Sequence, residues 1–107
     1  MSKSLEQTGI DFTLRLGEMV RWLRNDGKGF PLAEQLLICG VNAGMCCRDG
    51  KNRDAAKQVR QAEFMIQVAV SAGYLTDQQC VHILADCANL LNTLSGNSKR
   101  KTGEAVV

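Results

Sequence analysis

The side chains that could support metal or redox chemistry in this chain are five cysteines and one histidine. They are Cys39, Cys46, Cys47, Cys80, His82 and Cys87. Structural zinc sites use paired ligands at spacings such as C-x₂-C. Cys46 and Cys47 are adjacent and would point about 100° apart on a helix, whereas Cys39 and Cys46, seven residues apart, share one face. We therefore expect free thiols that pack in a core, with no metal and no cofactor; a redox role is the alternative.

His82 precedes Asp86 by about one helical turn, a spacing that permits either an exposed surface pair or a catalytic dyad. We predict the surface pair. The sequence has no Cys–His spacing, paired carboxylate site, phosphate-binding loop or dinucleotide fingerprint. These absences predict a protein that is not an enzyme.

A run of cations followed by one aromatic residue is the most distinctive surface pattern. Its members, named here the basic stripe, are Arg48, Lys51, Arg53, Lys57, Arg60 and Phe64. Spacings of four and three place residues 53–64 of the stripe on one helix face, and its first two residues in the preceding turn. A basic face with an exposed aromatic suits phosphate contact and base stacking. The sequence therefore predicts a nucleic-acid-binding site, with a plain solvated helix face as the alternative.

Four helices must position these residues. Apolar spacing predicts them over about 10–24, 31–48, 52–72 and 76–94, joined by short turns. Gly73 is a C-cap glycine for the third helix, and Thr76 with Gln79 forms a capping box for the fourth. Four helices with short connections predict an all-α, antiparallel up-down-up-down four-helix bundle.

The second predicted helix carries more apolar residues than one face can hold. Between residues 32 and 47 its one charge is Glu34. One side of such a helix can meet the core of its own bundle, so the other side needs a second subunit. Gly40 and Gly44 lie four residues apart and predict a close approach by another helix. We expect a homo-oligomer.

Length and composition fit one small domain. The chain has 107 residues, 45% of them apolar and 22% charged. We divide it into an N-terminal segment (1–9), a four-helix bundle (10–95) and a mobile basic tail (96–107). No apolar run is long enough to span a membrane, and the first residues lack the apolar region of a secretory signal. The odd number of cysteines favours a reducing cytoplasm.

The order of these features resembles a known family of four-helix bundles. It includes the proteins encoded in intervening sequences of large-subunit rRNA and the accessory variability proteins of diversity-generating retroelements. The resemblance covers about Phe12 to Leu94 and rests on "GFPLAEQL", "VNAGMC" and "QAEFMIQVAVSAGYLT". Asn42, Ala43 and Gly44 match only part of the Asn-Ile-Ala-Glu-Gly run of the intervening-sequence branch. "GFP" and the absence of that run are more similar to the retroelement branch.

This resemblance implies a homopentameric barrel of four-helix subunits. For the retroelement branch it implies a non-enzymatic accessory protein whose basic surface binds the reverse transcriptase and its RNA during mutagenic cDNA synthesis. The five cations of the basic stripe are the candidate contacts. That branch is strongly basic, whereas this chain carries a net charge of only +2. The alternative is an oligomeric four-helix bundle that serves as an interaction or regulatory module without nucleic-acid binding.

Overall fold

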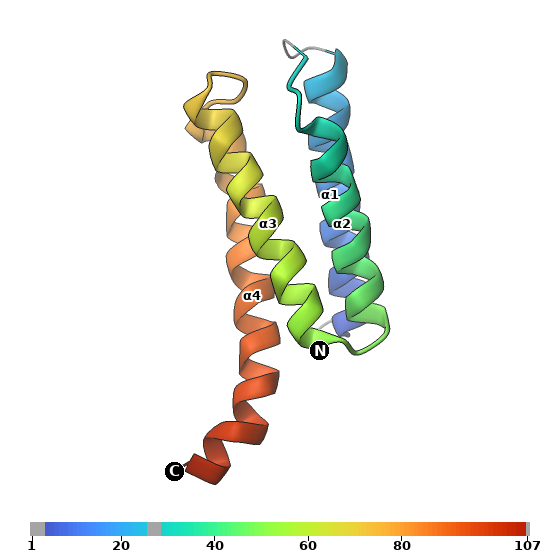
Figure 1. The fold of residues 1–107 in the computed structure, drawn as a ribbon, viewed down its shortest axis with the longest axis vertical. Helices are drawn as coiled ribbons and strands as arrows, with labels where there is room; N and C mark the ends of the chain where they lie inside the picture. Colours follow the sequence, from blue (N-terminus) through green and yellow to red (C-terminus); the bar gives the residue numbers. More distant parts are fainter. Residues whose placement is uncertain (1–3, 26–28, 107) are drawn as a thin grey trace.

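The structure, a computed structural model, describes the backbone of residues 4–25 and 29–106 and the side chains of residues 4–25 and 29–95. It contains α1 (Leu5–Asn25), α2 (Ala33–Arg48), α3 (Asn52–Ser71) and α4 (Asp77–Val106). No strand occurs among the described residues. Each helix packs antiparallel to the next, and α4 returns to α1 (Figure 1). The predicted all-α four-helix bundle is confirmed.

The core runs the length of the bundle and receives one apolar face from every helix. Its largest fully buried side chains are Leu16, Leu23, Leu36, Ile66, Leu90 and Leu94. At one end, the ring of Phe30 packs against that of Tyr74 with the centroids 4.9 Å apart, which joins the connection before α2 to the turn before α4. No described polar or charged residue is buried. Burial of apolar surface therefore supplies the main stabilisation.

Helices α1 and α2 approach closely at glycines. A methyl group at Gly40 would lie 2.7 Å from Cδ2 of Leu16, and one at Gly44 would lie 2.5 Å from Oγ1 of Thr13. The hydroxyl of Thr13 donates to the carbonyl oxygen of Gly40 at 2.9 Å across this contact. Close helix packing thus accounts for the two glycines, as the sequence predicted.

Helices α2 and α3 both end in the same hydrogen-bonded turn. In each, a glycine with positive φ follows the helix: Gly50 at +75° and Gly73 at +87°. The amide of Lys51 donates to the carbonyl of Cys46 at 2.9 Å, and that of Tyr74 to the carbonyl of Ala69 at 2.8 Å. This is the Schellman motif, in which glycine takes the left-handed conformation that other residues avoid. Gly73 is therefore the predicted C-cap.

The start of α4 also follows the prediction. The amide of Gln79 donates to Oγ1 of Thr76 at 3.2 Å, and the amide of Thr76 donates to Oε1 of Gln79 at 2.9 Å. These two bonds form a complete capping box. They fix the first turn of the helix that closes the bundle.

Two helix boundaries differ from the sequence-based ones. Helix α1 begins at Leu5 rather than near Ile10, because the amide of Gln7 donates to the hydroxyl of Ser4 at 3.1 Å and caps an earlier first turn. Helix α4 continues to Val106, past the boundary placed at residue 95. The side chains of 96–107 and the residues 26–28 of the predicted turn lie outside the described residues, and the mobility of the tail stays a prediction.

Candidate nucleic-acid interface

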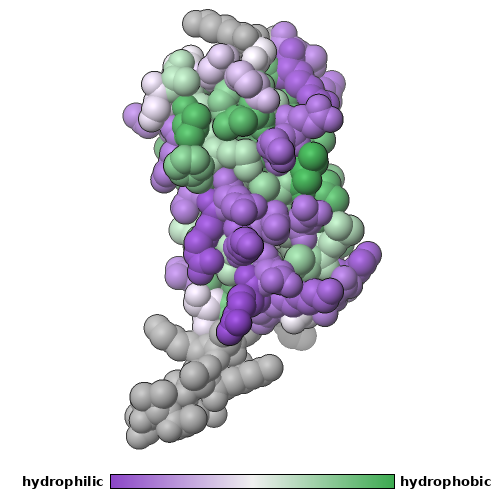
Figure 2. All heavy atoms as spheres, in the orientation of Figure 1, coloured by the Kyte–Doolittle hydropathy of each residue, from purple (hydrophilic) through white to green (hydrophobic). Residues whose placement is uncertain are grey.

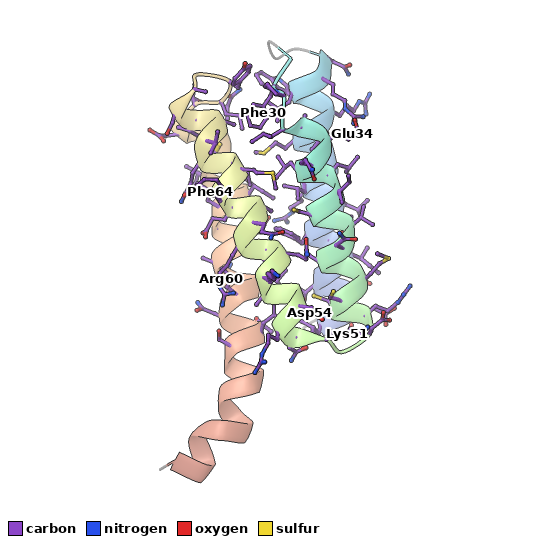
Figure 3. All side chains as sticks on the ribbon, viewed as in Figure 1. Phe30, Glu34, Lys51, Asp54, Arg60 and Phe64 are labelled. Atoms are coloured by element: carbon purple, nitrogen blue, oxygen red, sulfur yellow. The ribbon has the colours of Figure 1, made fainter. Side chains whose placement is uncertain are left out.

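The basic stripe lies on the outside of the bundle, as predicted. All five cations are exposed, and Phe64 keeps 64% of its surface accessible to solvent. Phe64 and Arg60 lie one turn apart on the same side of α3 (Figure 3). The opposite side of α3 buries Val59, Ala62 and Ile66. The spacing of the residues along α3 was enough to predict which face is exposed and which is buried.

One half of the stripe borders a groove between α2 and α3. The groove has a volume of about 430 Å³ and is lined by Gln35, Cys39, Lys57, Arg60, Gln61, Phe64 and Met65. Lys57, Arg60 and Phe64 therefore border the same shallow groove. Arg48, Lys51 and Arg53 do not line it. Arg48 is the last residue of α2 rather than part of the turn, Lys51 lies between the helices, and Arg53 lies in the first turn of α3. The structure thus divides the stripe into a groove group (Lys57, Arg60 and Phe64) and a turn group (Arg48, Lys51 and Arg53).

Among the described residues, Arg48 is the one cation of the stripe that forms an ion pair. Nε of Arg48 lies 2.9 Å from Oδ1 of Asp49, and this hydrogen bond, with the nearby charge of Lys51, holds the pKa of the Asp49 carboxyl below its usual value. Among the described residues, no carboxylate lies within 4.0 Å of Lys57 or Arg60. The groove cations are consequently free to meet an anion. Space-filling Figure 2 shows hydrophilic side chains gathered over the part of α3 nearer its start.

A thiol and an amide cross the α2–α3 contact at the groove. The Sγ of Cys39 donates a hydrogen bond to Oε1 of Gln61 at 3.7 Å. Cys39 is buried and Gln61 is exposed, so the contact ties an amide at the surface to the core. Sequence reasoning missed Gln61 and Gln35. The seven-residue spacing of Cys39 and Cys46 predicts that Cys39 is buried. It does not reveal that Cys39 bonds to Gln61 on α3.

The cysteines behave as packing residues. Cys39, Cys47, Cys80 and Cys87 are buried, Cys46 is half-buried, and all five are free. Burial raises the pKa of the Cys87 thiol to about 12, and the neighbouring Glu63 carboxylate adds to the shift. A thiol that stays protonated is a poor nucleophile and a poor metal ligand. In the described part of the chain, no three His, Cys, Asp or Glu side chains are grouped to hold a metal.

The predicted pairing of His82 with Asp86 is wrong. Nη1 of Arg15 donates to both carboxylate oxygens of Asp86, at 2.8 and 2.7 Å. The partner comes from α1, 71 positions earlier in the chain, so no local spacing could reveal it. His82 stays exposed and lines a second groove, of about 500 Å³, between α1 and α4.

Large apolar side chains remain exposed on the outside of α1 and α2. They are Ile10 and Leu14 on α1, and Ile38, Val41 and Met45 on α2. In Figure 2, apolar residues reach the surface along α2. The second helix thus has the surplus apolar face that its sequence predicted. Among the described residues, no helix is both long and apolar enough to cross a membrane.

These features define a four-helix protein with a groove lined by two cations and an exposed aromatic ring. A protein of unknown function from the S23 ribosomal protein family of Bacteroides thetaiotaomicron has a similar structure. The TM-score is 0.83 at 21% identity, over 89% of this chain and 95% of that one. No protein-family model matches the chain, and no curated protein matches it. The likeness supports the four-helix fold alone.

Proposed function

We propose that this protein is a non-enzymatic, oligomeric adaptor that binds RNA through the basic stripe. The observation that carries the proposal is the groove between α2 and α3, where two cations without carboxylate partners precede an exposed aromatic ring along α3. Cations at such a surface release counterions when they contact phosphates, which is the main source of affinity for RNA. The turn group at the start of α3 extends the same charge along the helix.

The specific role that we propose is that of an accessory variability protein of a diversity-generating retroelement. In this role the adaptor binds a reverse transcriptase and its RNA and supports mutagenic cDNA synthesis. The support is the sequence resemblance, above all "GFPLAEQL" and "SAGYLT".

We also propose that the subunits assemble through the apolar outer face of α1 and α2, most simply as the homopentamer that the resemblance implies. The support is the exposure of Ile38, Val41 and Met45, which lie at spacings of three and four on one side of α2. An oligomer would repeat the stripe several times. A subunit with a net charge of only +2 could then bind RNA through several weak sites at once.

RNA affinity measured at several ionic strengths tests the proposal. Replacing Arg53, Lys57 and Arg60 together with alanine should weaken binding and make the slope of log affinity against log salt shallower by about 0.7 for each lost phosphate contact. The fold should persist, because exposed substitutions change stability by about 0.5 kcal/mol or less. Arg21→Ala with Arg24→Ala, two exposed cations of α1, is the matched control and should leave both quantities nearly unchanged. Wild-type affinity and slope in the triple variant would refute RNA binding by the stripe.

The second candidate is an oligomeric interaction or regulatory module without nucleic-acid binding. The apolar outer face of α1 and α2 favours it independently of the stripe. A stable oligomer that shows no salt-dependent affinity for RNA would select this alternative.

A further inference from the structure

We infer that the groove between α2 and α3 is a nucleobase site, so that the protein selects single-stranded over double-stranded RNA. This inference rests on the proposed function. It begins with Phe64, which is 64% exposed although it lies directly on the wall of the groove. A large apolar ring held beside two cations is a stacking platform for a base whose backbone the cations can contact.

The cations are placed to hold the backbone of that nucleotide. Lys57 and Arg60 are three residues apart, and Phe64 follows one turn later, so successive turns of α3 present charge, charge and ring. All three side chains line the groove. A strand lying along α3 can therefore meet phosphate contacts and the ring together. The groove volume of about 430 Å³ falls within the range of small-molecule sites, roughly 300–1,000 Å³.

The lining of the groove also supplies an amide. Because Oε1 of Gln61 accepts from the thiol of Cys39, the Gln61 amide nitrogen is left as a donor. Gln61 lines the groove with Phe64 and is itself exposed. A base stacked on the ring would present its edge to this donor. The groove thus combines stacking with a hydrogen bond to an acceptor on the base edge.

This arrangement excludes paired bases. In a duplex the base faces are covered by neighbouring base pairs, so a side chain can stack only on a base that is unpaired and turned outward. A duplex can still contact the cations of the stripe. We therefore expect the ring and the amide to contribute to single-strand binding only, and the charges to contribute to both.

The test compares two probes at several salt concentrations: a single-stranded RNA of roughly 12 nucleotides, and the same RNA annealed to its complement. Phe64→Ala should lower the affinity for the single strand by about tenfold or more and leave the duplex affinity and the salt slope unchanged. Phe64→Tyr keeps a stacking ring and should retain single-strand affinity. Gln61→Met, nearly equal in size and uncharged, removes the amide donor and should also weaken single-strand binding while leaving duplex binding unchanged.

Equal affinity of the wild-type protein for both probes would overturn the inference, as would unchanged single-strand affinity in Phe64→Ala. Loss of the oligomer in Phe64→Ala, seen by light scattering, would also overturn it, since Phe64 would then lie between subunits. The triple cation variant separates the two levels. If the triple cation variant has a shallower salt slope while Phe64→Ala binds normally, only the nucleobase site is refuted. If the triple cation variant itself binds normally, the proposed function is refuted as well.

Discussion

Leu16 and Gly40 touch where α1 crosses α2, so closely that a methyl group at residue 40 would lie 2.7 Å from Cδ2 of Leu16. Leu16 is fully buried, so its side chain can move only by displacing other core residues. Gly17 lies one residue further along α1, but a methyl group there would meet only Cδ1 of Leu37, at 4.0 Å. Gly40 and Gly17 should therefore respond in opposite ways to substitution by alanine.

We expect Gly40→Ala to destabilise the protein and Gly17→Ala to stabilise it. Alanine is favoured over glycine in a helix by about 1 kcal/mol, and this gain applies at both positions. At Gly40 it is offset by an overpacking cost of about 1–3 kcal/mol, whereas Gly17 has room for the methyl group. Urea unfolding of the two variants measures the difference. Equal stability of both variants would show that α1 and α2 are not in contact at Gly40.

The capping box at the start of α4 predicts the effect of a second substitution. Thr76→Ala removes the acceptor for the amide of Gln79 and should cost about 1 kcal/mol in the free energy of unfolding. Thr93→Ala is the matched control, because the hydroxyl of Thr93 bonds only to the carbonyl of Asn89 inside the same helix. That control should change stability by about 0.5 kcal/mol or less. A cost in Thr93→Ala equal to that in Thr76→Ala would contradict the capping role.

The buried thiol of Cys87 predicts a loss of stability at alkaline pH. Its pKa is raised from the ordinary 9.0 to about 12 in the folded protein, so the unfolded chain loses this proton first as pH rises. The stabilising contribution is complete below about pH 9 and is lost progressively toward pH 12. Unfolding free energies at several alkaline pH values should fall less steeply in Cys87→Ala than in the wild type. Identical pH dependence would contradict the burial of this thiol.

Alkylation followed by mass spectrometry provides an independent check on the thiols. Cys46 is half-buried while the other four cysteines are buried, so Cys46 should react first in the folded protein. Cys87 should react only after denaturant is added. Early modification of Cys87 would show that the core opens at α4.

The apolar outer face of α1 and α2 predicts how the oligomer can be broken. Val41→Lys places a charge in the proposed subunit interface and should lower the mass measured by light scattering without unfolding the bundle. Val81→Lys, at an exposed valine of α4, is the control and should leave the mass unchanged. If Val41→Lys keeps the wild-type mass, the subunit interface does not include Val41. If the wild-type protein is itself a monomer, the proposed interface does not exist.

Local signals in the sequence predicted most of the fold. The capping box at Thr76, the glycine after α3 and the apolar spacing of α3 each involve residues within a few positions of one another, and each was recovered. The start of α1 was missed, although Ser4 and Gln7 repeat the spacing of Thr76 and Gln79. The missed signal was therefore present: a serine at position 4 followed by a glutamine at position 7.

The candidate site was less predictable because its geometry depends on contacts between helices. Spacing along α3 placed Lys57, Arg60 and Phe64 on one face, and the structure agrees. It could not show that Gln35 and Cys39 of α2 complete a groove there, since 22 positions separate Cys39 from Gln61. For the same reason the sequence did not reveal the ion pair of Asp86, because its partner Arg15 lies on another helix.

Thr8 and Thr93 line one small cavity of about 170 Å³, so the first turns of α1 and the stretch of α4 around residue 93 lie at the same end of the bundle. A linker can join two chain positions that are adjacent in this way, which is what circular permutation requires. A short glycine-serine linker from residue 95 to Ser4, replacing the part of α4 after residue 95, with the chain reopened at the exposed Gly50, would produce the helix order α3, α4, α1, α2. We expect the permuted chain to form the same bundle, because the contacts between neighbouring helices are kept. In the permuted protein the groove residues of α3 would be made first and those of α2 last, so the proposed nucleobase site would form only when the chain is complete.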